Sequence, residues 1–115
     1  MFNLFGITIE KFENIHCDEF EMIINNQRDT NIYEIIDVRT PEEYHAGHIP
    51  DAKLFNLMDP SFRNMISQLD PHKTHYVYCR SGSRSMTACR IMAEAGIDKL
   101  YNLKFGLMGW QGPLV

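Results

Sequence analysis

Two short, mostly apolar runs decide which fold class this chain can adopt. Residues 33–38 and 75–78 are rich in aromatic and β-branched side chains, and each run leads straight into a polar segment. Such runs are typical of strands that are buried on both faces of a parallel sheet. Residues 52–57 and 99–103 are two further candidate strands. Helical stretches separate these strands, so we predict an α/β fold, a small and mostly parallel sheet flanked by helices on both faces.

Helical patterns lie around these strands, at residues 18–26, 59–69, 85–95 and 107–111. The first has acidic residues in its first turn, where they suit the positive end of the helix dipole. A further short helix is predicted after Thr40, because a Thr cap, Pro41 in the first turn and Glu43 three residues after the cap are typical of a helix start. Gly47 is expected to end that helix.

The length and composition of the chain indicate one domain. Its 115 residues are 44% hydrophobic and 23% charged, as in an ordinary globular domain with one core. We therefore predict a single domain over residues 1–115. Residues 1–14 are expected to form an N-terminal extension or an edge strand, with a candidate strand at residues 6–9.

Charge and cysteine content exclude several kinds of partner and site. The net charge of -4 argues against nucleic acid or an anionic membrane as the main partner. Three widely separated cysteines argue against a disulfide framework and a cysteine-rich zinc site, and they favour a reducing compartment. The sequence has no signal-peptide pattern, and no apolar run approaches the roughly 20 residues that span a bilayer. We therefore expect a cytoplasmic protein that binds neither nucleic acid nor membrane.

Cys79 has the sequence context of a reactive thiol. It follows the strand at residues 75–78 and precedes a short loop and a helix, and reactive sites in parallel sheets lie beyond the carboxyl ends of the strands. The N–H groups of a helix N-terminus, and of a tight loop turning at Gly82, both stabilise a thiolate. Arg80 and Arg84 add positive charge. We predict a pKa for Cys79 below the ordinary thiol value of about 8.5, which favours a nucleophile over a buried structural cysteine.

Four segments resemble those of the single-domain rhodanese family. Residues 79–85 read CRSGSRS and look like that family's active-site loop. Three other segments are similar to its remaining motifs: IDVR at residues 36–39, EYHAGHIPDA at residues 43–52 and LKFGLMGW at residues 103–110. All four occur in the family's order, and the resemblance is strongest over residues 15–110. One departure is that the family usually has two glycines where this chain has Phe105 and Gly106.

The resemblance implies a sulfurtransferase of the thiosulfate:cyanide type. Such an enzyme would take a sulfane sulfur from a donor such as thiosulfate, hold it as a persulfide on Cys79 and pass it to a thiophilic acceptor. The loop N–H groups would cradle the persulfide anion, and the arginines would attract an anionic donor. The substrate-binding residues that the resemblance implies are Arg80, Ser81, Gly82, Ser83 and Arg84.

The implied partners are small sulfur-containing molecules, and no metal or organic cofactor is implied. Thiosulfate, polysulfide, glutathione persulfide and a protein partner all fit as sulfur donor or acceptor. The resemblance does not choose between these.

Two other functions fit the same loop. Phosphatases and arsenate reductases of similar fold place an arginine six positions after the cysteine, whereas Arg84 falls five positions after Cys79 and Ser85 follows it. A phosphate or arsenate needs a wider cradle than one outer sulfur, so the shorter loop favours sulfur transfer. The other alternative is a non-enzymatic module that carries or binds a persulfide. Inactive rhodanese-like domains typically lack the cysteine, which this chain keeps.

Asp37 and Arg39 are expected to support the site from the end of the strand at residues 33–38. Contact with substrate or loop is one interpretation. An internal ion pair, for instance of Arg39 with Glu43, is favoured, because a charge beside a buried sheet end needs a partner.

No role in the chemistry is assigned to four of the histidines, and Cys17 stays unassigned. His45 and His48 have no third metal ligand nearby in the sequence, so they are expected to pack in a turn. His72 and His75 are expected to be solvated. Cys89 lies in the predicted helix at residues 85–95 and is expected to fill the core; a role as resolving thiol for Cys79 is the less favoured alternative.

Overall fold

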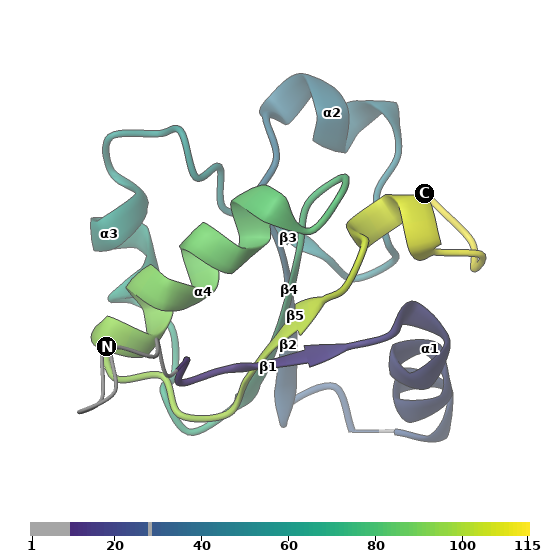
Figure 1. The fold of residues 1–115 in the computed structure, drawn as a ribbon, viewed down its shortest axis with the longest axis horizontal. Helices are drawn as coiled ribbons and strands as arrows, with labels where there is room; N and C mark the ends of the chain where they lie inside the picture. Colours follow the sequence, from purple (N-terminus) through teal and green to yellow (C-terminus); the bar gives the residue numbers. More distant parts are fainter. Residues whose placement is uncertain (1–9, 28) are drawn as a thin grey trace, which may run out of the picture.

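The strands form one parallel sheet. The computed structural model describes residues 10–27 and 29–115, so the candidate strand at residues 6–9 lies outside the described residues. Within them the sheet has five strands in the order β1-β5-β4-β2-β3, and each neighbouring pair is parallel (Figure 1). The strands are β1 (Glu13–Ile15), β2 (Tyr33–Asp37), β3 (Lys53–Leu54), β4 (Thr74–Tyr78) and β5 (Leu100–Leu103). The predicted α/β class is confirmed.

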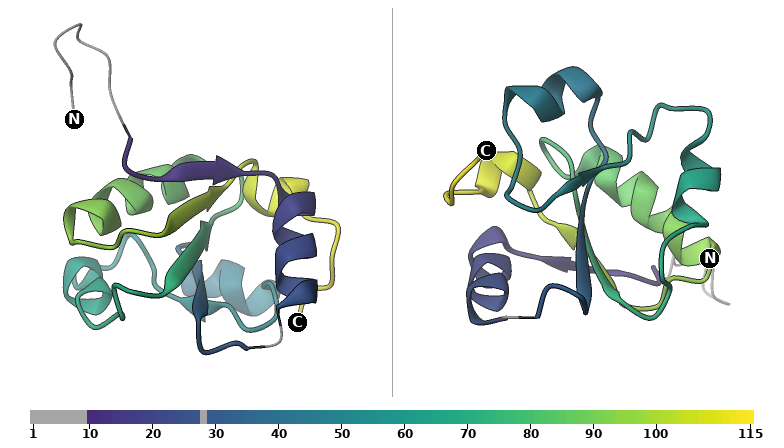
Figure 2. Two further views of the ribbon diagram at one scale, coloured as in Figure 1. Left: turned by 90° about the horizontal axis from the view of Figure 1, so that it is seen from below. Right: turned by 180° about the vertical axis from the view of Figure 1, so that it is seen from behind.

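Helices cover both faces of the sheet, as predicted. They are α1 (Cys17–Asn26), α2 (Pro41–Ala46), α3 (Phe62–Ile66), α4 (Ser83–Glu94) and the short 3-10 helix η1 (Gly106–Gly109). α3 and α4 pack on one face and α1 and η1 on the other, whereas α2 lies beyond one end of the central strands (Figures 1 and 2). None of the described helices combines the length and the apolar character needed to cross a bilayer.

The central strand β4 divides the core into two halves, because its side chains alternate between the two faces of the sheet. Val77, with Cys79 just beyond the strand, packs in the cluster that α3 and α4 complete. Tyr76 and Tyr78 pack in the opposite cluster, where Phe20 of α1 is fully buried. The continuous apolar run at β4 is thus explained by burial on both faces.

His75 corrects one expectation from the sequence. It is fully buried in β4 rather than solvated, because β4 begins one residue earlier, at Thr74, and both of its neighbours in the sheet are strands. Its Nδ1 lies 2.9 Å from the carbonyl oxygen of Lys73. Burial lowers the pKa of His75.

The two edges of the sheet are short. Of the predicted strand at residues 52–57, only Lys53–Leu54 pairs as a strand, because it lies at an edge and meets only the last two residues of β2. At the opposite edge the three-residue strand β1 pairs with β5.

Two helices differ from their sequence patterns at their ends. Of the predicted helix at residues 59–69, only α3 (Phe62–Ile66) is regular helix. A turn precedes it, in which the N–H of Ser61 donates to the carboxylate of Asp59. Phe62 and Ile66 of this helix are buried in the core. α4 begins at Ser83, two residues earlier than predicted, directly after Gly82 in a left-handed conformation.

Candidate active site

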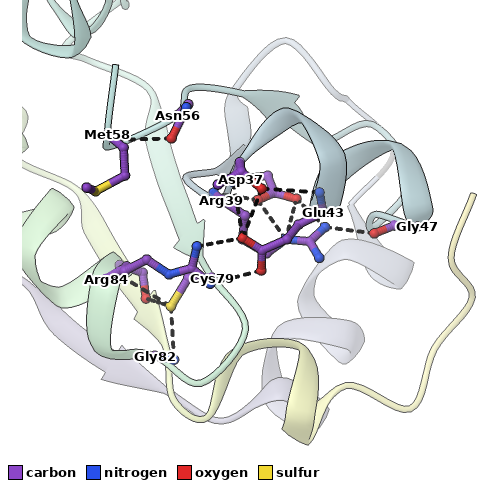
Figure 3. Close-up of polar contacts among 11 residues, drawn as sticks. Asp37, Arg39, Glu43, Gly47, Asn56, Met58, Cys79, Gly82 and Arg84 are labelled. Carbon is purple, nitrogen blue, oxygen red and sulfur yellow. Dashed lines mark hydrogen bonds and ion pairs between the residues drawn. The ribbon is translucent and has the colours of Figure 1, made fainter. Parts of the chain in front are cut away.

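The register of the sheet brings two distant segments together. β2 and β4 are neighbours, with Asp37 opposite Tyr78, and the N–H of Val38 donates to the carbonyl of Tyr78 at 3.1 Å. Cys79, the next residue, therefore lies beside the segment that contains Arg39. This is the carboxyl edge of a parallel sheet, where reactive groups gather in α/β folds. Figure 3 shows the loop after β4 facing α2 at this edge.

The thiol of Cys79 is surrounded by hydrogen-bond donors. Its Sγ accepts from the N–H of Gly82 at 3.1 Å and from the N–H of Ser85 at 3.4 Å, and it lies 3.4 Å from the Ser85 hydroxyl. Ser85 is in the first turn of α4, where backbone N–H groups have no partners within the helix. Cys79 has no exposed surface in this arrangement.

Two opposing effects set the pKa of Cys79. Burial, the largest single effect, raises the pKa, because the protein interior solvates a thiolate poorly. Hydrogen bonds from the Ser85 hydroxyl and from the N–H groups of Ser85, Gly82 and Ser81 act in the opposite direction. Together they prevail, and the pKa of Cys79 is lowered, the direction expected from the sequence. Hydrogen bonds rather than arginine charges are the chief cause.

Two glycines allow the loop to turn its N–H groups toward the sulfur. Gly82 has a φ of +97°, and a Cβ there would lie 3.1 Å from the backbone nitrogen of Phe105. Gly106 has a φ of +53°, and a Cβ there would collide with the carbonyl oxygen of Cys79. This close approach lets the N–H groups of Leu107 and Met108 donate to the carbonyls of Cys79 and Arg80, each at 3.0 Å. These two carbonyls therefore face η1. The N–H groups of Gly82 and Ser85, further along the chain, donate to the thiol.

Phe105 occupies the position where the resemblance led us to expect glycine. It adopts the left-handed conformation that glycine favours, with a φ of +66°, and its side chain is 55% exposed. The turn into η1 therefore forms although Phe105 replaces the expected glycine. The backbone of Phe105 is strained, because a non-glycine residue is disfavoured in this conformation.

Arg84 does not stand free beside the thiol. Its Nη1 and Nη2 donate to Oε1 and Oε2 of Glu43 at 2.7 and 3.0 Å, a bidentate ion pair between α4 and α2 (Figure 3). The Arg84 hydrogen bonds lower the pKa of Glu43 to about 2. Glu43 also completes the predicted capping box with Thr40 at the start of α2.

Asp37 and Arg39 form the internal ion pair that was favoured, but with each other. Arg39 Nη2 donates to Asp37 Oδ2 at 2.7 Å, and Nε contacts both carboxylate oxygens at 3.0 Å. The example pairing of Arg39 with Glu43 is wrong, because Glu43 faces α4. Both members of the actual pair are buried, and Arg39 also donates to the carbonyl of Gly47 at 2.7 Å. The pair therefore ties the end of β2 to the end of α2.

The loop residues predicted from the sequence differ in whether they contact the sulfur or are exposed to solvent. Gly82 contacts the sulfur through its N–H, and the Ser81 N–H also favours the thiolate. The side chains of Arg80, Ser81 and Ser83 are exposed.

Two residues at the site were not identified from the sequence as functional. Ser85 donates to the sulfur, and its position six residues after the cysteine, in the first helical turn, is the signal that could have found it. Glu43 was expected only as a capping residue and as an example of an ion-pair partner for Arg39. Its contact with Arg84 bridges 41 positions of sequence and leaves no local signal.

The other two cysteines are buried and free. Cys89 is fully buried in the cluster beneath α4, where burial raises its pKa, so the prediction of a core residue is confirmed. Cys17 Sγ donates to the carbonyl of Gly106 at 3.2 Å, and burial raises its pKa as well.

Comparison with known proteins agrees with this architecture. The family model of the Rhodanese-like domain matches residues 18–113. A protein named sulfurtransferase from Allochromatium vinosum is 32% identical over 90 residues, which cover 78% of this chain and 82% of that protein. The crystal structure of a rhodanese-like domain protein from Staphylococcus aureus has a TM-score of 0.75 and 28% identity, covering 88% of this chain and 92% of that one. A rhodanese from E. coli, solved with anions, has a TM-score of 0.61 and 31% identity, covering 72% of this chain and 96% of its own. The chain therefore belongs to the rhodanese-like domain family.

Proposed function

We propose that this protein is a sulfurtransferase that carries a sulfane sulfur as a persulfide on Cys79. The observation that carries the proposal is the ring of donors around Sγ, the N–H groups of Gly82 and Ser85 and the Ser85 hydroxyl. These donors favour a thiolate, which is the nucleophilic form of cysteine. The name of the Allochromatium vinosum relative supports the same reaction class.

The reaction consists of two displacements at one sulfur atom. The Cys79 thiolate attacks the outer sulfur of a donor such as thiosulfate, the new Sγ–S bond forms, and the S–S bond of the donor breaks. The bonding electron pair leaves with sulfite. In the second step a nucleophilic acceptor, such as cyanide or a thiolate, attacks the outer sulfur of the persulfide. The Sγ–S bond then breaks, and its electron pair restores the thiolate.

The surrounding residues support both displacements. The loop N–H groups stabilise negative charge on the thiolate and on the outer sulfur of the persulfide. Exposed Arg80 attracts an anionic donor. The buried pair of Asp37 and Arg39 supports the site by fixing the end of β2, without touching the sulfur in this arrangement. The chemistry requires no metal and no organic cofactor.

Phosphoryl transfer is less well supported by the same geometry. A thiolate phosphatase needs a guanidinium that is free to bind the oxygens of the phosphoryl group. Here Arg84 is held by both carboxylate oxygens of Glu43, and the next position is a serine that contacts the sulfur. These contacts favour transfer of a single sulfur atom over transfer of a phosphoryl group.

The test is to incubate the purified protein with thiosulfate and measure its intact mass, with Cys79→Ser and Cys89→Ser as a matched pair of variants. We expect the wild type and Cys89→Ser to gain the mass of one sulfur atom, which cyanide removes as thiocyanate. Cys79→Ser should gain none, because an alcohol forms no persulfide. A sulfur adduct on Cys79→Ser, or hydrolysis of an aryl phosphate by the wild type without any sulfur adduct, would contradict the proposal.

A further inference from the structure

Glu43 is fixed beside the active-site loop by contacts from two directions. Its carboxylate accepts from both Nη atoms of Arg84 at 2.7 and 3.0 Å. It also accepts from the N–H and the hydroxyl of Thr40, at 3.3 and 3.2 Å. Only about a third of each side chain of the ion pair is exposed. The carboxylate therefore holds the Arg84 guanidinium in one place, close to Cys79 (Figure 3).

The charges around the thiol cancel in pairs. Asp37 and Arg39 form one buried pair, and Arg84 and Glu43 form the other. Arg80 follows the cysteine directly and is exposed, and it has no ion pair within residues 10–27 and 29–115. Of the two arginines of the loop, only Arg80 is thus left without a carboxylate partner among the described residues.

We propose that Glu43 acts through Arg84 as a positioning residue that sets the charge selectivity of the site. By holding Arg84 and cancelling its charge, it favours sulfur donors with one negative charge over dianions of the same shape. This inference rests on the proposed sulfur transfer through Cys79. The preferred sulfur donors are then singly charged persulfides and thiosulfonates, and thiosulfate, a dianion, is used less well.

The physical reason is that repulsion by a carboxylate grows in proportion to the charge of the donor. Neutralising Glu43 therefore helps a dianion by about twice as much free energy as a monoanion. A merely structural role of Glu43 would change the use of both donors alike, so the ratio between them isolates the electrostatic role.

Thiosulfate and methanethiosulfonate form a suitable pair of donors. In the second, a methyl group replaces one charged oxygen of the first, which removes one negative charge and keeps the shape. Both present the same outer sulfur to the thiolate. The donor S–S bond breaks in each case, and the electron pair leaves with sulfite or with methanesulfinate.

The experiment measures kcat/KM for both donors, with cyanide as acceptor, in the wild type, Glu43→Gln and Glu42→Gln. Glutamine can keep the capping contact with Thr40, and Glu42 is an exposed carboxylate in the same turn. In Glu43→Gln the ratio of thiosulfate to methanethiosulfonate should rise about five- to tenfold at low salt, mainly through KM for thiosulfate, and should rise less at high salt. Glu42→Gln should leave the ratio within about twofold of the wild type, since an exposed charge is screened.

Three results would overturn this inference in distinguishable ways. An unchanged ratio in Glu43→Gln, with both donors still used, removes the role of Glu43 and leaves sulfur transfer intact. If the ratio of the two donors rises equally in Glu42→Gln, the selectivity comes from the overall negative charge of α2 and not from the contact between Glu43 and Arg84. A wild type that takes sulfur from neither donor overturns the proposed function together with the inference.

Discussion

Two cysteines of one hydrophobic cluster, Cys79 and Cys89, have opposite acid–base properties. Neither has exposed surface, and burial by itself raises the pKa of each thiol. In Cys89 burial prevails and the pKa is raised, whereas in Cys79 the hydrogen bonds from Ser85, Gly82 and Ser81 outweigh it. The comparison teaches that the supply of free donors, rather than residue type or burial, decides which thiol has a lowered pKa.

The helix that follows the loop explains this difference. Cys79 precedes α4, whose first-turn N–H groups are free to donate to the sulfur. Cys89 lies in the middle of the same helix, where each N–H bonds to a carbonyl one turn earlier. One helix thus donates hydrogen bonds to the thiol before its N-terminus and none of this kind to the thiol in its interior.

The largest effect is expected from Gly106→Ala, which places a methyl group against the carbonyl of Cys79. The loop must move, and displaced donors should reduce kcat/KM for sulfur transfer about a hundredfold. Gly96→Ala is the matched control after the helix of Cys89, since Gly96 also has a positive φ, +99°, but nothing within 4 Å of a Cβ. It should cost about 1 kcal/mol of unfolding free energy and leave kcat/KM unchanged. Equal losses of activity in the two variants would contradict the loop geometry.

Ser85→Ala should make Cys79 more like Cys89. Removing the hydroxyl removes one hydrogen bond to the thiolate, so the pKa of Cys79 should rise by about one unit. Alkylation by iodoacetamide at neutral pH should slow accordingly. The control is Ser83→Ala, in which an exposed side chain is truncated. If both variants keep the pKa of the wild type, the hydroxyl has no part in activating the thiol.

Cys89→Ala tests whether Cys89 only fills the core and takes no part in the reaction. Truncating a buried core side chain should lower the free energy of unfolding by about 1 kcal/mol in urea titrations. Turnover should stay within about twofold of the wild type, because no hydrogen bond to Cys79 is lost. A disulfide between the two cysteines that appears during turnover would instead make Cys89 a reactive partner.

Arg80→Ala is expected to have the smallest effect. Its side chain is exposed, so its attraction for an anionic donor is screened and should change KM for thiosulfate by about two- to fivefold. The pKa of Cys79 should change less than in Ser85→Ala, since hydrogen bonds are the chief cause of its shift. Added salt should remove the difference in KM from the wild type. A larger pKa change in Arg80→Ala than in Ser85→Ala would reverse this order of causes.

Much of the fold and the position of the thiol followed from local patterns. The buried runs of β2 and β4, the capping box at Thr40 and the left-handed turn at Gly82 each depend on a few adjacent residues. Because parallel strands present their carboxyl ends at one edge, these patterns also placed Cys79 at that edge.

The contacts between distant elements could not be predicted in the same way. The pairing of Glu43 with Arg84 depends on how α2 and α4 meet, and the sequence pattern suggested Arg39 for that carboxylate instead. The burial of His75 depends on the neighbours of β4 in the sheet. In each case the deciding partner lies far away in the sequence, where propensity and spacing carry no information.

The most direct measurement of the central claim is the pH dependence of alkylation of each thiol, followed by peptide mass analysis under native conditions. A lowered pKa means that the thiolate persists at lower pH, so the alkylation midpoint of Cys79 should lie below the ordinary thiol value of about 8.5. Cys89, whose pKa is raised, should stay unmodified across the same range until the protein is unfolded. A midpoint for Cys79 at or above about 8.5, or equal reactivity of the two cysteines, would contradict the account.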